Sequence, residues 1–495
     1  MSSLFVGVDL GTSATKAILI SSPEEVISQS SLPLDELRGD HVFGEFDATE
    51  IVNSVEEALR WGRKIAADLG STVAGLGLAV QRSGVVAWRG AEPLSPVLSW
   101  RVGRDEERVA EVVSDGALSG RITERTGLVP NTFFAGPKVG WLQKQFPEPT
   151  VKVGTLDAWV VSRLADVMPF VTDDSMASRT LLYDLEEGGW SRELCSVWGV
   201  DCERLPQIIP SVCRRRGAIG GVSVGVSIGD KEAATVLAIR RAGGVAALDL
   251  GTLATLTFVS AELPKPQSGI SRGVLYSTED AKGRRHRVYQ QELRSSIVGD
   301  TLDWVRMMIG AEVSFDQLVE FWEAGREHDG VIFSLPRTGS SVVAAGGRHG
   351  APCCEGLGSG PEHLVRAAVE HIIFSIADLI GTARVAGLFV CQRGVSVSGR
   401  LVRMPGLPEI LARIAGIDIG VDDGVNDEGI VSGSALGAAV LASDRVGGKG
   451  WFDQPRMGLG AVRWITPGQF LADGSLVSRY RRWSELRDRV MMRHV

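Results

Sequence analysis

Two aspartates stand in nearly the same short motif, about 240 residues apart. Residues 5–16 read FVGVDLGTSATK and residues 244–257 read GVAALDLGTLATLT, so apolar residues lead into Asp-Leu-Gly-Thr in both. Each copy is typical of a strand, a sharp turn and a returning strand. The glycine permits close backbone approach, and the hydroxyls after it can bond a phosphate. Two such hairpins would hold a polyphosphate across a cleft, whereas one hairpin alone is equally compatible with a simple turn.

The elements that position these motifs indicate an α/β protein. A chain of 495 residues is too long for one core and suits two domains, and a repeat at this spacing favours two domains of like fold over a solenoid. Strand-like and helical stretches alternate, which predicts mixed sheets. The clearest are strands at Val73–Val80 and Val85–Trp88, helices at Ala48–Leu69, Ala367–Ala386 and Leu407–Ile414, and a docking helix at Ser478–Val495.

The composition excludes several classes of protein. With 44% hydrophobic and 23% charged residues the chain is not disordered, and a net charge of −8 argues against a nucleic-acid binder. We expect no membrane span and a cytoplasmic location, since no apolar run is long enough and the N-terminus lacks a signal-peptide pattern. The six scattered cysteines predict neither a disulfide framework nor a zinc site, and the basic runs 214–216 and 284–287 are interpreted as solvated loops.

The two motifs belong to a longer series of segments that resembles the FGGY carbohydrate kinases. The segments follow the family's order over nearly the whole chain. They include LAVQRSGVVAW (78–88), VLSWRVGR (97–104), TGLVPNTFFAGPKVGWL (126–142), VTDDSMASRTLLYDL (171–185), SIGDKEAATVLA (227–238), RSSIVGDTLDWVR (294–306) and SGSALGAAVLA (432–442).

The resemblance implies two actin-like (ribonuclease H-like) ATPase domains with mixed sheets, over residues 1–240 and 241–495. ATP would meet a small sugar or polyol in the cleft between them, with sugar contacts mainly from the first domain and nucleotide contacts mainly from the second. Since dimers are common in that family, a homodimer is compatible with the resemblance.

The same resemblance assigns the central chemistry to two acids. Asp230, in the family's Gly-Asp-x-x-Ala segment, would be the base that accepts the proton of the attacking hydroxyl. An aspartate before a helical stretch is also a common N-cap, and one residue can serve both roles. Asp9 would orient a hydrated Mg²⁺ through its carboxylate, the alternative being a turn aspartate that bonds nearby amides.

Further residues are carried over as contacts to the nucleotide or the sugar. For the sugar, Gln81 and Arg82 are multi-donor side chains, while Trp100 and Phe133 would form apolar walls or belong to the core. The nucleotide and its phosphates would be contacted by Gly11, Thr12, Ser13, Lys16, Gly251, Thr252, Gly299, Gly399 and Arg400.

The sequence also departs from the family's pattern near the expected pocket. Ser83 replaces a glutamate, Val102 a common aspartate, and Lys231 a polar neutral residue, so acids are lost and positive charge is gained. We hypothesise a substrate that carries a carboxylate or a phosphate. On the adenine side, Gly399 is the only glycine of the expected cluster, and Arg400 after it would stack on adenine, reach a phosphate or obstruct the site.

These observations predict an ATP- and Mg²⁺-dependent kinase acting on a hydroxyl of a small sugar, polyol or sugar acid. One alternative is a catalytically degenerate sugar or nucleotide sensor of the same fold, favoured by the missing glycines. The other is an actin- or chaperone-like ATPase acting on proteins, which would turn over ATP without any sugar.

Overall fold

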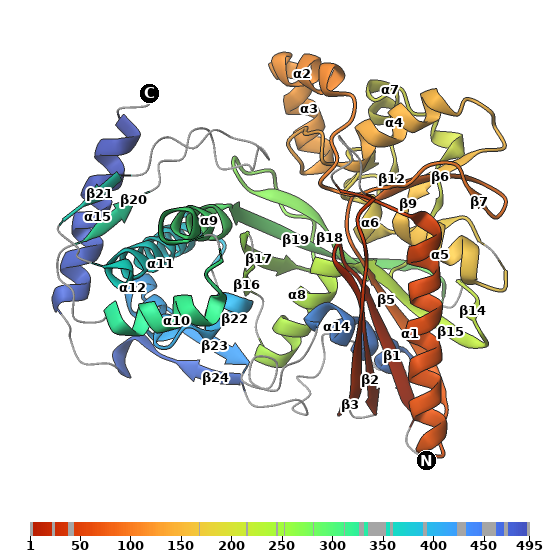
Figure 1. Ribbon diagram of the computed structural model, residues 1–495. Helices are drawn as coiled ribbons and strands as arrows, with labels where there is room; N and C mark the ends of the chain where they lie inside the picture. The colour runs from red at the N-terminus through yellow and green to blue at the C-terminus, as the bar shows by residue number, and fades with distance from the viewer. Residues whose placement is uncertain are drawn as a thin grey trace.

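The protein was analysed as a computed structural model, in which two large mixed sheets are connected by helices (Figure 1). The structure describes residues 3–21, 25–37, 44–167, 169–213, 216–243, 246–251, 253–280, 282–310, 312–325, 331–334, 353–356, 360–389, 394–422, 432–447, 462–469 and 474–492.

The first sheet has six strands, and the first motif forms its central hairpin. β1 pairs antiparallel with β2, in a register that sets Asp9 opposite Lys16, and parallel with β5. The strand order is β3 (Val26–Pro33), β2 (Ala14–Ser21), β1 (Leu4–Leu10), β5 (Val73–Val80), β15 (Val222–Gly229) and β14 (Ala218–Ile219).

The second sheet repeats this order and adds one strand at its edge. β16 pairs antiparallel with β17 and parallel with β22, as β1 does with β2 and β5. The shared topology explains the repeated motif as the same hairpin used twice. The order is β18 (Ser271–Glu279), β19 (Arg285–Ser295), β17 (Ala254–Ser260), β16 (Ala246–Leu250), β22 (Gly394–Ser398), β23 (Asp418–Asp422) and β24 (Val462–Ile465).

The two faces of the first sheet are covered by different helices. Because side chains alternate along a strand, Val6 and Val8 of β1 join the core under α1 (Ala48–Asp68), while Phe5 joins the core of α8 (Asp230–Ala242) and α14 (Gly433–Gly447). Asp9 has the parity of Phe5, so the alternation directs its carboxylate toward α14.

Helix α8 lies between the two sheets (Figure 1). Its side with Ala233 and Val236 packs in the core shared with α14 and the first sheet, and its side with Ala234 and Ala238 lines a cavity toward the second sheet. The predicted division between residues 240 and 241 falls within this helix.

The core of the second sheet is built by helices on one face. α15, at the predicted docking helix, packs through Trp483, whose indole N–H donates to His371 of α11 at 2.8 Å, and through Tyr480, which donates to Asp378 at 2.7 Å. The docked position confirms that prediction. The helices are α9 (Ile297–Ile309), α10 (Phe315–Ala324), α11 (Pro361–Val385), α12 (Leu407–Ala415) and α15 (Gly474–Met492), with the hairpin β20 (Ile332–Ser334) and β21 (Cys353–Glu355) nearby.

A third, smaller region consists mainly of the segment between β5 and β15, and it is joined by β4 (Glu45–Phe46), which precedes β5 and pairs with β8. No disulfide framework is predicted from the sequence, and the described residues contain a single disulfide, between Cys195 and Cys202, with a Cα–Cα distance of 6.1 Å. Cysteine spacing alone does not reveal a pairing that the fold of the α7 loop creates. The elements are β4 (Glu45–Phe46), β6 (Val85–Arg89), β7 (Glu92–Pro93), β8 (Val97–Leu98), β9 (Lys152–Thr155), β10 (Val171–Asp173), β11 (Tyr183–Asp184), β12 (Gly189–Trp190), β13 (Gln207–Ile209), α2 (Glu106–Ser114), α3 (Gly116–Thr126), α4 (Ala135–Gln145), α5 (Leu156–Leu164), α6 (Asp174–Ala177) and α7 (Arg192–Val197).

The interpretation of the basic runs as solvated loops is wrong for several members. Arg216 is buried and donates to the carbonyls of Ser211 and Pro210 at 3.1 and 2.9 Å. Arg285 and Arg287 lie on β19, and both contact the buried carboxylate of Asp174, at 3.3 and 3.1 Å. Arg285 and Arg287 are held by an acceptor from a distant segment, whereas Arg216 is buried by a fold of its own loop.

The described helices include none that combines the length and the apolar character needed to cross a bilayer.

The close approach of α14 to α8 predicts a strict requirement for glycine at position 437. A Cβ there would lie 2.1 Å from the carbonyl oxygen of Ala233, so the two helices must separate. We expect Gly437→Ala to destabilise the fold by about 1–3 kcal/mol, measured by urea unfolding.

The matched control is Gly381→Ala, near the C-terminal end of α11, where an added Cβ meets nothing within 4 Å. That change should stabilise the protein by about 1 kcal/mol through helix propensity alone. Equal midpoints for the two variants would contradict the close helix contact.

Candidate active site

Asp9 is held at the end of β1 by the first residue before α14. Ser432 donates its hydroxyl to Asp9 Oδ2 at 2.7 Å, and the same hydroxyl accepts the N–H of Ala435 at 3.1 Å. Burial raises the pKa of Asp9, while the Ser432 hydrogen bond and the charge of Lys16 lower it. The carboxylate is therefore oriented by a residue 423 positions away in the chain.

Asp230 stands at the junction of β15 and α8. The N-cap of α8 is Gly229, so Asp230 is the first helical residue and not the cap. The N–H of Gly229 donates to the hydroxyl of Ser175 at 2.9 Å, which anchors the backbone just before the aspartate. The Asp230 side chain is one-third exposed, and its Oδ1 lies 3.9 Å from Nε of Arg82.

Burial of the carboxylate raises the pKa of Asp230 to about 7, with the charges of Asp9 and Glu232 acting in the same direction and that of Arg82 opposing them. A carboxylate with such a pKa can accept a proton near neutral pH.

The acid of the second motif is paired across the cleft. Lys231 of α8 donates to Asp249 Oδ2 of β16 at 2.7 Å. Asp249 is 39% exposed on its side chain, so the pair lies at the cavity surface. Gly251 follows in the turn after β16, and Thr252 lies outside the described residues.

These groups line one cavity of about 750 Å³ between α8 and the second sheet. Carboxylates from both motifs and from the start of α8 face the same space. The lining residues are Asp9, Lys16, Asp230, Lys231, Ala234, Thr235, Ala238, Ala247, Asp249, Thr255, Thr257, Ser398, Gly399, Arg400, Arg403, Ser432, Gly433 and Ser434.

Several other residues predicted to contact the nucleotide are not among those that line this cavity. Gly11, Thr12 and Ser13 form the turn between β1 and β2, closed by a hydrogen bond from the N–H of Gly11 to the carbonyl of Ala14 at 3.2 Å. Gly299 lies in the first turn of α9 and is not among the residues that line the cavity.

The turn after β22 needs its glycine. Gly399 has φ +106°, and a Cβ would lie 2.6 Å from the Leu250 carbonyl. The guanidinium of Arg400 lies over the ring of Phe315, 4.5 Å from its centroid, at the edge of the cavity. Arg400 is thus already stacked on a side chain of the protein.

The residues predicted to contact sugar are placed differently from one another. Gln81 is buried and donates to the carbonyl of Gly11 at 3.4 Å, so it also supports the first hairpin. Trp100 is 40% exposed, which excludes the interpretation as a core residue. Phe133 is half-buried, packs on Phe134 and lines a second cavity, of about 170 Å³.

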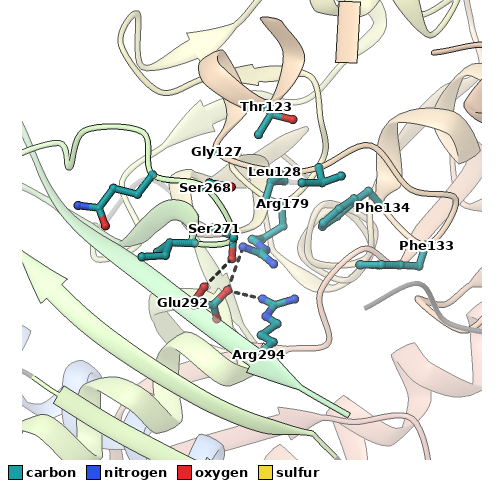
Figure 2. A pocket seen from close by; sticks show the side chains of 14 residues that line it. Thr123, Gly127, Leu128, Phe133, Phe134, Arg179, Ser268, Ser271, Glu292 and Arg294 are labelled. Carbon is teal, nitrogen blue, oxygen red and sulfur yellow. Dashed lines mark hydrogen bonds and ion pairs between the residues drawn. The ribbon is translucent and has the colours of Figure 1, made fainter. Parts of the chain in front are cut away.

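Arg82 connects the two cavities through acids that the sequence reasoning missed. Its Nη1 lies 2.8 Å from Glu232 and 3.3 Å from Glu292, and these charges raise its pKa although burial opposes them. Glu292 also pairs with Arg179 at 3.1 Å and with Arg294 (Figure 2). Burial disfavours ionisation of Glu292, but the three guanidiniums hold its pKa well below the ordinary value.

A signal for this cluster exists in the sequence. Gln290, Glu292 and Arg294 are alternate residues of β19, so they share one face of the strand. Polar side chains at a period of two on a strand of a large sheet predict either a solvent face or a buried polar site.

Lys138 fixes the loops that carry the predicted sugar contacts. Its buried ammonium donates to the carbonyls of Ser83 at 2.6 Å, Ser99 at 2.8 Å and Phe133 at 2.9 Å. These residues adjoin or include Arg82, Trp100 and Phe133. Burial lowers the pKa of Lys138 well below its usual value, and the charge of Arg104 adds to the effect.

The donor set fits a metal ion bound largely through water. No cluster of three or more His, Cys, Asp or Glu side chains suited to direct ligation occurs within the described ranges. Mg²⁺ typically keeps several waters and takes one or two carboxylates, and Asp9, with Asp230 and Asp249 on the same cavity, supplies that kind of shell.

Two sheets share the same strand order, and each contributes the aspartate of its Asp-Leu-Gly-Thr hairpin to one cavity between them. This arrangement defines the actin-like ATPase fold.

Residues 4–216 match the model for the N-terminal domain of the FGGY family of carbohydrate kinases. A glycerol kinase from Shewanella woodyi is 25% identical over 464 residues, 89% of this chain and 90% of that protein.

Solved structures agree with this fold. The Plasmodium falciparum glycerol kinase crystallised with ADP has a TM-score of 0.84 at 19% identity, covering 99% of this chain and 98% of that one. A xylulose kinase from Lactobacillus acidophilus has a TM-score of 0.79 at 18% identity, with 99% and 98% covered. Over residues 4–216 the chain therefore matches the FGGY family of carbohydrate kinases, and over nearly its whole length it has the fold of solved glycerol and xylulose kinases.

The three carbonyl contacts of Lys138 predict a large loss of stability in Lys138→Met. Each buried carbonyl left without a donor costs about 1–3 kcal/mol, so we expect a loss of about 3 kcal/mol or more in urea unfolding.

Lys144→Met is the matched control, because Lys144 is exposed on the same helix, α4. It should change stability by less than about 0.5 kcal/mol. A Lys138→Met protein as stable as this control would show that the ammonium does not fix the three loops.

Proposed function

We propose that this protein is an ATP- and Mg²⁺-dependent kinase for a small sugar, polyol or sugar acid, with Asp230 as the base. The observation that supports it most directly is the position of Asp230. Its carboxylate lines the cavity that holds both hairpin acids and lies 3.9 Å from Arg82, which leads to the second cavity. We infer that residues 1–240 supply most sugar contacts and 241–495 most nucleotide contacts.

The proposed reaction is a direct displacement at phosphorus. The substrate hydroxyl oxygen bonds to the γ-phosphorus of ATP, the bond from that phosphorus to the β,γ-bridging oxygen breaks, and ADP leaves. Asp230 accepts the hydroxyl proton as this occurs. Mg²⁺, when bound near Asp9, neutralises phosphate charge.

The chain's own cations complete this arrangement. Lys16 lies opposite Asp9 in the β1–β2 pair, and Lys231 is adjacent in sequence to the base. Both line the larger cavity, of about 750 Å³, where a fixed positive charge stabilises the negative charge that develops on the transferred phosphoryl group. If a polyphosphate binds near Asp249, the ammonium of Lys231 lies between the Asp249 carboxylate and a phosphate, and it can form an ion pair with either.

The test of the base is ADP release from ATP and Mg²⁺ across a panel of polyols, ketoses and sugar acids. We expect sugar-dependent release, and a fall in kcat of about 10²–10⁴-fold in Asp230→Asn. Asp303→Asn, at a 79% exposed side chain of α9, is the control and should leave kcat unchanged.

ATP binding by calorimetry without turnover of any panel member would favour the degenerate sensor. ADP release that is independent of sugar would favour the protein-directed ATPase. Either result overturns the assignment as a carbohydrate kinase.

The raised pKa of Asp230 predicts a pH dependence with a definite sign. The base must be ionised, and burial raises its pKa to about 7. Therefore kcat/KM should rise between about pH 6 and pH 8 and then level off. Recovery of full activity after return to pH 8 excludes acid inactivation.

Asp173 is the control for this profile, since its pKa is also raised to about 7, by burial and by the charge of Asp157. Asp173 caps α6 and does not line either cavity. Asp173→Asn should keep the rise near pH 7. A profile that is flat or falling in the unmodified enzyme would rule out Asp230 as the base.

A further inference from the structure

The second cavity is lined by two arginines and one glutamate, and the proposed phosphoryl transfer does not require these side chains. It lies between the α3–α4 connection, the residues before β18, and β19, and its volume is about 170 Å³. That volume suits one end of a small molecule and is far below that of a typical nucleotide or drug-sized site. Figure 2 shows Arg179 and Arg294 on either side of Glu292 at this cavity.

The charges at this cavity do not balance. Among the residues that line it, the ionisable side chains are Arg179, Glu292 and Arg294, so two cations face one anion. Arg82, on the other side of Glu292, is offset by Glu232 at 2.8 Å. Asp230 also lies 3.9 Å from Arg82, so the excess of one positive charge belongs to the residues that line this cavity and not to the whole cluster of arginines and acids.

The two arginines also keep unused donors. Nη1 of Arg179 lies 3.1 Å from Glu292 without a well-directed hydrogen bond, and Nε of Arg294 has no hydrogen-bond partner within the described part of the chain. Arg179 is 2% exposed, so water does not solvate it freely. A buried guanidinium with free donors is best satisfied by a carboxylate or phosphate oxygen.

Burial and the like charge of neighbouring arginines both disfavour the protonated form of the two guanidiniums at this cavity. Burial lowers the pKa of Arg179 to about 9, and the nearby charge of Arg294 adds to this. Burial likewise lowers the pKa of Arg294. Both changes would be reversed by an anion in the cavity, because a negative charge stabilises the protonated guanidinium.

The second cavity lies close enough to Asp230 for one substrate to reach both. Its reacting hydroxyl would lie at Asp230 and its opposite end in this cavity. One guanidinium group, that of Arg82, lies between Asp230 at 3.9 Å and Glu292 at 3.3 Å. The rings of Phe133 and Phe134 form an apolar wall for a carbon chain, and the hydroxyl of Ser271 lies in the lining.

We propose, on the basis of the function proposed above, that Arg179 and Arg294 bind an anionic group, a carboxylate or a phosphate, at the end of the substrate opposite the phosphorylated hydroxyl. Glu292 orients the two guanidiniums and accepts a hydrogen bond from the substrate hydroxyl on the carbon next to the anionic group. The preferred substrates are therefore sugar acids or sugar phosphates, and neutral polyols are poor ones.

The experiment compares matched pairs of compounds with the full-length enzyme. Aldonates of four to six carbons are tested against alditols of the same length, and sugar phosphates of the same length form a third group. ADP release gives kcat/KM, and calorimetry without ATP gives binding. We expect at least a tenfold higher kcat/KM for one anionic group over the alditols, and the group that wins identifies carboxylate or phosphate.

Arg294→Gln removes the charge and keeps hydrogen-bonding capacity. It should raise KM for the anionic substrate at least tenfold, change kcat little, and reduce the preference over the alditol. Arg192→Gln is the control, at an 88% exposed side chain, and should leave every constant unchanged. Unfolding curves establish that both variants are folded.

The outcomes separate this inference from the proposed function. Phosphorylation of alditols in preference to both anionic groups overturns the anion subsite and leaves the kinase assignment standing. Binding of an anionic compound without any phosphoryl transfer supports the subsite and overturns the kinase assignment. Binding of no compound, or equal loss on acids and alditols in Arg294→Gln, overturns the subsite.

Discussion

The close approach of α14 to the first sheet and to α8 sets the distances within the active site. Cβ atoms at Gly7 and Gly77 would lie 1.9 and 2.1 Å from carbonyl oxygens of α14, and one at Gly437 would lie 2.1 Å from that of Ala233. Backbones in contact leave little freedom to slide. Ser432 at the start of α14 therefore reaches Asp9, and α8 presents Asp230 to the same cavity.

The fold and the first members of the site were predictable because their signals are local. Alternation along β1 and β16, a glycine after each aspartate, and a helical stretch after Asp230 are each contained in a dozen residues. The partners of these residues were not predictable in the same way. Ser432 bonds Asp9 across 423 positions, and Arg82 reaches Glu292 across 210. No local pattern encodes such pairs, and the contacts of Lys138 with Ser83 and Ser99 are of the same kind. The Cys195–Cys202 bond and the burial of Arg216 join residues that are close in sequence, but both depend on how a loop folds.

The electrostatics of the site oppose those of the whole chain. The protein carries a net charge of −8, yet buried guanidiniums outnumber carboxylates around the smaller cavity. Buried ion pairs of this kind are weak contributors to stability, because desolvation offsets much of the attraction. Their arrangement is better explained by binding, since groups that are fixed in advance need no reorganisation when a charged ligand arrives.

The two hairpins have the same topology and different chemistry. Asp9 is buried and held by a serine, while Asp249 is exposed and held by Lys231. Each hairpin must fit the same strand order of its own sheet, so both keep the same backbone topology. The site does not need the same contact from both aspartates, so their side-chain partners can differ. The two copies therefore form an asymmetric pair around one cavity, in which the first aspartate accepts a hydrogen bond from a hydroxyl and the second accepts one from an ammonium.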